Sequence, residues 1–265
     1  MLTRIHEKAK YCRAFETVVF EQIKKGNINI PTYLSAGQEF IPATISVFCE
    51  EIGVKPLIFG QHRAHSTYLC FGGDVVQLID ELLGLSTGCA GGMGGSASIH
   101  SPDINMFGHD GLMGSNVPIG TGACFAKREP TIVFVGDAAA EEDYALSSYG
   151  WAATKQLPIL YVVEDNNLSI LTEKRVRRSW EISPVASAMG LDAATLEDSP
   201  ARIIEALGLN WNFKTPKLLN IETVRLFWHA GAGVDGEPRD LLKDVNIETE
   251  VEFFRSLWED RLNER

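Results

Sequence analysis

Residues 131–167 read TIVFVGDAAAEEDYALSSYGWAATKQLPILYVVEDNN, and their apolar pattern points to one class of fold. The runs 131–135 and 159–164 are short and rich in β-branched residues, which is typical of buried strands. Residues 142–155 between them have helical character, and Pro158 follows shortly after. A strand, a helix and a second strand in this order predict two parallel strands joined by a right-handed crossover.

Polar residues follow both predicted strands, Asp137 after the first and Asn167 after the second. Parallel strands end at the same edge of a sheet, and ligands of open α/β sheets bind there. A carboxylate and an amide oxygen suit magnesium, which often takes further ligands from a substrate's phosphates. A helix beginning near Ala139 would favour phosphate through its free amide groups. Each half of the pattern is common alone, but together they predict a site for magnesium and a phosphate-bearing ligand.

The rest of the chain alternates predicted helices with a further strand. This predicts an α/β fold with a mostly parallel sheet, helices on both faces and a single domain over residues 1–265. No internal repeat or interdomain linker interrupts it. Apolar spacing and Gly stops predict helices at 4–25, 37–51, 74–84, 111–127, 199–208 and 247–258, and a strand at 217–227.

A glycine-rich segment, GLSTGCAGGMGGSASIH, covers residues 84–100. Its glycine density excludes a helix or a central strand and predicts a loop with positive φ or close backbone approach. A flexible surface loop, a cofactor contact and a subunit contact all remain open for it. In the predicted helix 111–127, Gly120, Gly122 and Ala123 would let another backbone come close.

Composition limits the possible functions. The chain has 265 residues, 45% of them hydrophobic, and a formal net charge of −11. This charge argues against nucleic acid or anionic membrane as a partner, and the basic run 174–178 is too short to reverse that. No apolar run is long enough for a membrane span. Charged residues interrupt the apolar residues of the N-terminal segment, which argues against a secretion signal. Five cysteines without metal-binding spacing predict free thiols in a reducing cytoplasm.

Several ordered motifs resemble a known family. The pattern GDA, then a gap, then NN is similar to the thiamine diphosphate-binding motif. Nearly the whole chain looks like the alpha subunit of the decarboxylating component of 2-oxoacid dehydrogenase complexes, of the pyruvate, acetoin and branched-chain types. The further segments that carry this resemblance are SAGQE (35–39), HRAHS (62–66), GCAGGMGGSASIH (88–100), GLMGSNVPIGTGACFA (111–126) and TVRLFWHAGAG (223–233).

The resemblance implies a set of site residues. It assigns magnesium to Asp137, Asn167 and the backbone carbonyl of Ser169. It gives His65 and His229 catalytic positions, with His65 facing the substrate. It implies contacts to thiamine diphosphate for His62, Arg63, Gly111, Met113, Gly136, Asp137, Ala138, Ala139 and Asn167. Without the resemblance, Arg63 could equally form a surface ion pair, and His62 and His65 could be hydrogen-bonded histidines in the core or at the rim of a pocket.

The chain also departs from the family pattern. Ala138 replaces the third residue of the GDG motif, and His62 stands where Tyr is usual. The usual histidine of the late loop aligns with Gly231, two residues after His229, and a serine that is phosphorylated in some relatives aligns with Ala232. These differences indicate a divergent branch without that regulation.

The implied function is incomplete in one chain. In this family a beta subunit supplies the glutamate that activates the cofactor, so an α₂β₂ heterotetramer is expected. The enzyme would decarboxylate a small 2-oxo acid and pass the acyl or aldehyde unit to an acceptor, such as the lipoyl group of an acyltransferase. Two alternatives stay open: half of a split transketolase-like enzyme that moves a two-carbon unit, and a non-catalytic regulatory subunit of this fold.

Overall fold

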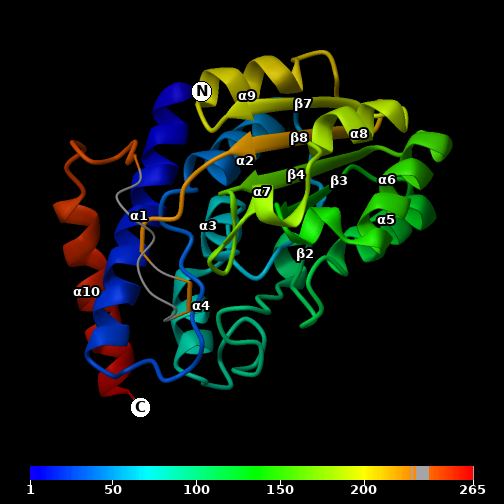
Figure 1. Cartoon of the computed structure of the whole chain (residues 1–265). Helices are drawn as coiled ribbons and strands as arrows, with labels where there is room; N and C mark the ends of the chain where they lie inside the picture. The colour runs from blue at the N-terminus through cyan, green and yellow to red at the C-terminus, as the bar shows by residue number, and fades with distance from the viewer. Residues whose placement is uncertain (228, 231–238, 265) are drawn as a thin grey trace.

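The computed structural model describes residues 1–227, 229–230 and 239–264. Its centre is a six-stranded sheet in the order β2-β1-β3-β4-β8-β7, and every pairing within it is parallel (Figure 1). This confirms the predicted α/β class. The strands are β1 (Leu57–Phe59), β2 (Met106–Phe107), β3 (Thr131–Gly136), β4 (Ile159–Asp165), β7 (Asp192–Glu197) and β8 (Lys217–Glu222), and β5 (Leu168–Ser169) pairs separately with β6 (Thr172–Glu173) in antiparallel fashion.

Helices surround this sheet, and two short 3₁₀ turns, Pro102–Ile104 and Ala139–Glu141, connect elements. No described helix combines the length and the apolar character that crossing a bilayer requires. The helices are α1 (Leu2–Lys24), α2 (Phe40–Glu51), α3 (His65–Cys70), α4 (Val75–Leu82), α5 (Asn116–Lys127), α6 (Asp143–Lys155), α7 (Lys174–Arg177), α8 (Ile182–Ala188), α9 (Pro200–Leu207) and α10 (Glu248–Asn263).

Alternate residues of the central strands enter two separate cores. Along β3, Ile132 and Phe134 join the core that contains residues of α1, α2 and α10. Val133 and Val135 join the core that contains residues of α5, α6 and α8. Because successive side chains of a strand point to opposite faces, helices must cover both faces of the sheet, as the prediction required.

Among the predicted boundaries that differ from the structure, two have a clear local cause. Helix α5 begins at Asn116 and not at 111, because Gly111 and Gly114 have φ angles of +102° and +83°. Strand β8 ends at Glu222 and not at 227. Beyond it, the N–H of Leu226 donates to the carbonyl of Ala36 at 3.0 Å, so the chain leaves the sheet and packs on the segment before α2.

The glycine-rich segment is held by one buried carboxylate. Glu81 in α4 accepts hydrogen bonds of 2.7 to 2.9 Å from backbone N–H groups of the loop, and its side chain is fully buried. The four donors are Ala90, Gly92, Gly94 and Gly95. The loop is therefore folded around Glu81.

Candidate functional site

The carboxyl ends of neighbouring parallel strands bring distant segments to one edge of the sheet. Gln61, His62 and Arg63 follow β1, Asp137 follows β3 and Asn166 follows β4. These strands are adjacent in the order β1-β3-β4, so the residues after them lie together although they are far apart in sequence.

A cavity of 310 Å³ opens at this edge. It is lined by nine of the residues that the sequence singles out: His62, Arg63, Met113, Gly136, Asp137, Ala138, Ala139, Ser169 and His229. Sequence reasoning missed its other lining residues, which are Tyr33, Gln61, Glu142, Asn166, Leu168, Ile170 and Arg225. Most of these residues lie within three positions of a predicted site residue, and this proximity in sequence could have indicated them. No feature of the sequence indicates Tyr33.

Asn166 lines the cavity, whereas Asn167 lies outside it. Asn167 is exposed with a left-handed φ of +65°, and its side-chain oxygen accepts a hydrogen bond of 3.3 Å from the N–H of Lys174. The side-chain oxygen of Asn166 accepts from the N–H of Leu168 at 3.1 Å and thereby forms a turn at the end of β4. Of the two asparagines, only Asn166 belongs to the lining of the cavity.

His65 and Gly111 also lie outside the lining. His65 is fully buried at the start of α3; its Nδ1 lies 3.0 Å from Glu16 Oε1 and its Nε2 lies 2.9 Å from Ser96 Oγ. Gly111 donates its N–H to His109 Nδ1 at 3.0 Å, close in sequence to Met113 of the lining. Gly231 and Ala232 of the late loop fall outside the described residues.

Asp137 is the buried acid of the cavity. Its side chain is 2% exposed, and it accepts a hydrogen bond from Arg177. Burial and the nearby carboxylate of Asp165 raise the pKa of Asp137 to about 6, against the opposing effect of Arg177 and Arg178. Both arginines keep buried N–H groups without a hydrogen-bond partner, although each lies within 3.4 Å of a Glu141 oxygen. This end of the cavity thus has surplus donor capacity.

Two buried arginines supply positive charge. Arg63 Nη1 donates to the carbonyl of Leu34 at 2.6 Å, and its Nη2 lies 3.0 Å from His229 Nδ1. Arg225 Nη2 donates to the carbonyl of Ile170 at 2.7 Å. Both arginine residues are 3% exposed, so their charge acts in a poorly hydrated space. Such planar, fixed donors suit a phosphate or diphosphate group.

The imidazole of His62 is neutral in this surrounding. Burial and the charge of Arg63 lower the pKa of His62 to about 2, and its Nε2 is buried without a hydrogen-bond partner. The ring of Tyr33 packs edge-on against His62 and His229, with centroid distances of 4.9 and 5.6 Å. An unpartnered ring nitrogen beside the cavity is free to bond a ligand that enters it.

The sequence and the fold of the chain match those of known proteins. The model of the family described as dehydrogenase E1 component matches residues 7–197. Pyruvate dehydrogenase E1 component subunit alpha-3, chloroplastic, of Arabidopsis thaliana is 27% identical over 86% of this chain and 56% of its own length. The alpha subunit of the same component in Zymomonas mobilis is 26% identical over 75% of this chain and 58% of its own length.

The chain therefore spans between half and three fifths of these curated relatives. Among solved structures, transketolase from Campylobacter jejuni has a TM-score of 0.64 at 16% identity, covering 98% of this chain and 48% of that one. At this identity the likeness concerns the fold alone.

Proposed function

Because the chain belongs to the dehydrogenase E1 component family, we propose that it is the alpha subunit of a thiamine diphosphate- and magnesium-dependent enzyme that decarboxylates a 2-oxo acid. The acyl or aldehyde unit would pass to an acceptor such as a lipoyl group. The observation that carries this proposal is that buried Asp137, Arg63 and Arg225 all line one cavity. One carboxylate for a metal and two guanidinium groups for a diphosphate match the two halves of such a cofactor.

The donor set fits magnesium. Asp137 offers a carboxylate, Asn166 an amide oxygen, and Leu168 or Ser169 a backbone carbonyl, all at the cavity. The sequence-based candidate for the amide ligand is Asn167; the proposal names Asn166 instead, because Asn166 lines the cavity and Asn167 does not. Arg177 must first release the carboxylate of Asp137.

The remaining residues fit the organic part of the cofactor, which when bound supplies a carbanion that attacks the 2-oxo acid. Arg63 and Arg225 would hold the diphosphate together with the N–H groups of Ala138 and Ala139 at the 3₁₀ turn. Met113 and Gly111 would border the aminopyrimidine. Neutral His62 would contact the diphosphate beside Arg63, and His229 would contact the substrate and hold or move its proton, whereas buried His65 would act by positioning.

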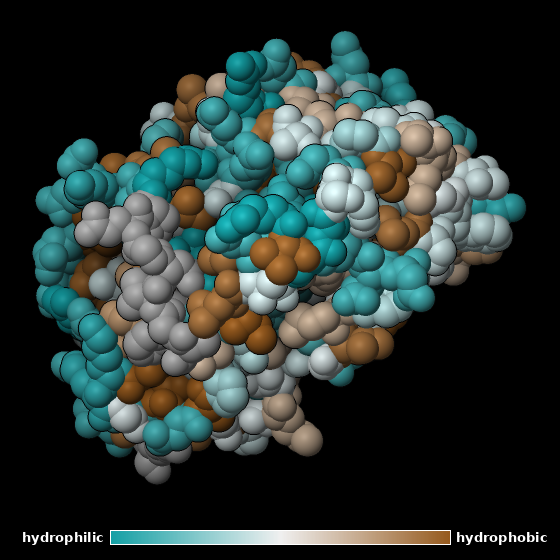
Figure 2. All heavy atoms as spheres, in the orientation of Figure 1, coloured by the Kyte–Doolittle hydropathy of each residue, from teal (hydrophilic) through white to brown (hydrophobic). Residues whose placement is uncertain are grey.

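A beta subunit is part of the proposal. Leu112, Met113, Ile170 and Leu171 near the cavity are between 41% and 59% exposed, so large apolar side chains are open to solvent there. Figure 2 shows hydrophobic residues in the middle of this face, next to the hydrophilic residues over the region that Figure 1 labels α7. A partner covering this surface in an α₂β₂ assembly would exclude water and add the missing acid. The five thiols are all free, which supports a cytoplasmic location.

The decisive test is calorimetric titration of thiamine diphosphate with magnesium, on this chain alone and on the chain co-expressed with its beta subunit. Asp137→Asn should abolish the magnesium-dependent heat, whereas the matched change Asp143→Asn, at the exposed start of α6, should not. Binding that is unchanged in Asp137→Asn would refute the proposed metal site. Absence of binding in both preparations would favour a regulatory subunit in which Arg177 permanently occupies Asp137.

A further inference from the structure

One border of the central sheet is open. Strand β7 is the last strand of the sheet, and among the described residues only β8 pairs with it. The N–H of Asp192 donates to the carbonyl of Pro216 at 3.2 Å, which fixes the residues whose backbone groups point toward β8. The alternate residues turn their N–H and C=O groups to the open border: Ala193, Thr195 and Glu197.

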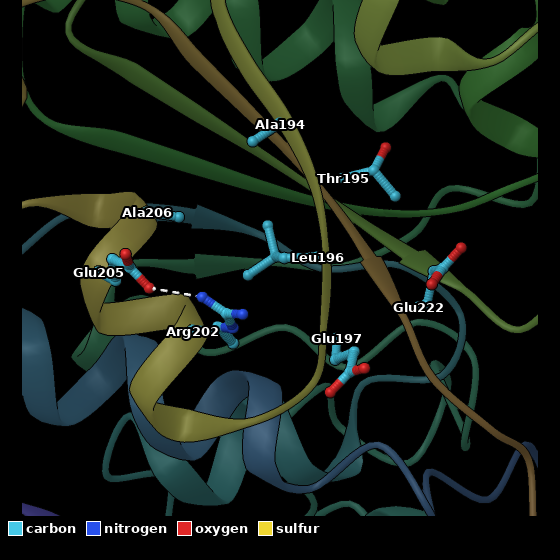
Figure 3. A pocket seen from close by; sticks show the side chains of 8 residues that line it. All are labelled: Ala194, Thr195, Leu196, Glu197, Arg202, Glu205, Ala206 and Glu222. Atoms are coloured by element: carbon cyan, nitrogen blue, oxygen red, sulfur yellow. Dashed lines mark hydrogen bonds and ion pairs between the residues drawn. The ribbon is translucent and has the colours of Figure 1, made fainter.

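A groove of 560 Å³ follows this border between β7 and α9 (Figure 3). Four consecutive residues of β7, 194–197, line it. Because successive side chains of a strand point to opposite faces, this lining places the groove along the edge of the strand and not over one face. Arg202, Glu205 and Ala206 of α9 form the opposite wall. The groove therefore combines unpaired backbone groups with a side-chain wall, as strand addition requires.

The groove is acidic. Glu197, Glu205 and Glu222 line it, and the one cation in its lining, Arg202, donates to Glu205 at 3.0 Å. Nearby Lys217 and Arg239 are bonded to Asp192 and Asp198, respectively. At least two carboxylates are left without a cationic partner in the described lining, so positive charge would be attracted to this edge.

A second copy of the chain fits poorly here. Two β7 strands paired antiparallel about a two-fold axis must place outward-facing residues opposite each other. The register centred on Thr195 brings Asp192 of each chain opposite Asp198 of the other, and like charges directly opposite are destabilising. We propose that the β7–α9 groove binds an extended, basic peptide segment, which adds as a seventh strand and directs lysine or arginine side chains toward Glu197 and Glu222. This proposal does not depend on the cofactor.

Fluorescence anisotropy with a labelled octapeptide of alternating lysine and valine tests the proposal on the full chain. Thr195→Pro removes an N–H at the open border and leaves the β8 ladder its donors, so it should weaken binding by about tenfold or more. Thr195→Ala keeps the N–H and should bind like the unchanged protein. Replacing both Glu197 and Glu222 with Gln should weaken binding and flatten its salt dependence.

A second peptide keeps the test valid even if Thr195→Pro does not fold. The same octapeptide, N-methylated at every second amide, has unchanged charge but cannot extend the sheet, and it should lose binding to the unchanged protein. Equal binding of both peptides would overturn strand addition. Equal binding of an acidic octapeptide would overturn the assigned partner class. A dimer in sedimentation that Thr195→Pro dissociates would assign the border to a second copy and overturn the proposal.

Discussion

Replacing Glu81 with Gln is expected to lower the free energy of unfolding by about 3 kcal/mol. The carboxylate accepts from Ala90 and Gly92 through Oε2 and from Gly94 and Gly95 through Oε1. Gln retains one acceptor oxygen and presents an NH₂ group to the other two donors. Each buried N–H left without an acceptor costs roughly 1–3 kcal/mol, and relaxation of the loop recovers part of the sum.

Urea denaturation measures this loss, and the exposed Glu129→Gln is the matched control, expected to change stability by less than about 0.5 kcal/mol. Limited proteolysis gives an independent readout, because a loop that has lost its central acceptor should be cut faster within residues 88–95. A loss below about 1 kcal/mol in Glu81→Gln, together with unchanged cleavage, would show that the hydrogen bonds to this carboxylate do not hold the loop.

Two further predictions concern the sheet. Burial raises the pKa of Glu164 to about 7 from 4.5, so its contribution to stability is complete below pH 4.5 and is lost as pH rises through 7, a span worth about 3 kcal/mol. Glu164→Gln should remove this slope from urea unfolding between pH 5 and 8, and an unchanged slope would contradict it. A Cβ at Gly120 would lie 2.7 Å from Val133 Cγ2, whereas one at Gly122 meets nothing within 4 Å. Gly120→Ala should therefore destabilise by about 1–2 kcal/mol and Gly122→Ala should stabilise by up to about 1 kcal/mol; thermal unfolding that moves both variants the same way would refute this.

Local pattern was enough to predict the sheet edge that carries the cavity. Two buried strands around one helix leave little choice of topology, so Asp137 was expected near the residues that follow β4. Which asparagine of the pair enters the cavity could not be predicted. That depends on the left-handed φ of Asn167 and its bond to Lys174, and spacing contains no information on either.

Contacts between distant segments explain the other differences. His65 is buried through partners at Glu16 and Ser96, 49 and 31 positions away, and no periodicity reveals such a pair. Arg225 was overlooked because residues 217–227 were expected to continue as a strand, whereas β8 ends at Glu222. The chain turns there because Leu226 bonds to Ala36.

Because Arg177 is paired with Asp137, a metal ion must compete with a cation that is tethered to the same chain. Arg177 cannot diffuse away, so its effective concentration at the carboxylate does not change when the solution is diluted. A metal ion that binds Asp137 must displace it, and its apparent dissociation constant rises by the inverse of the fraction of molecules in which the carboxylate is open. An open fraction of about one in a hundred would weaken metal binding about a hundredfold. Any ligand that offers Arg177 another anion would restore that affinity, so metal and anion should bind with positive cooperativity.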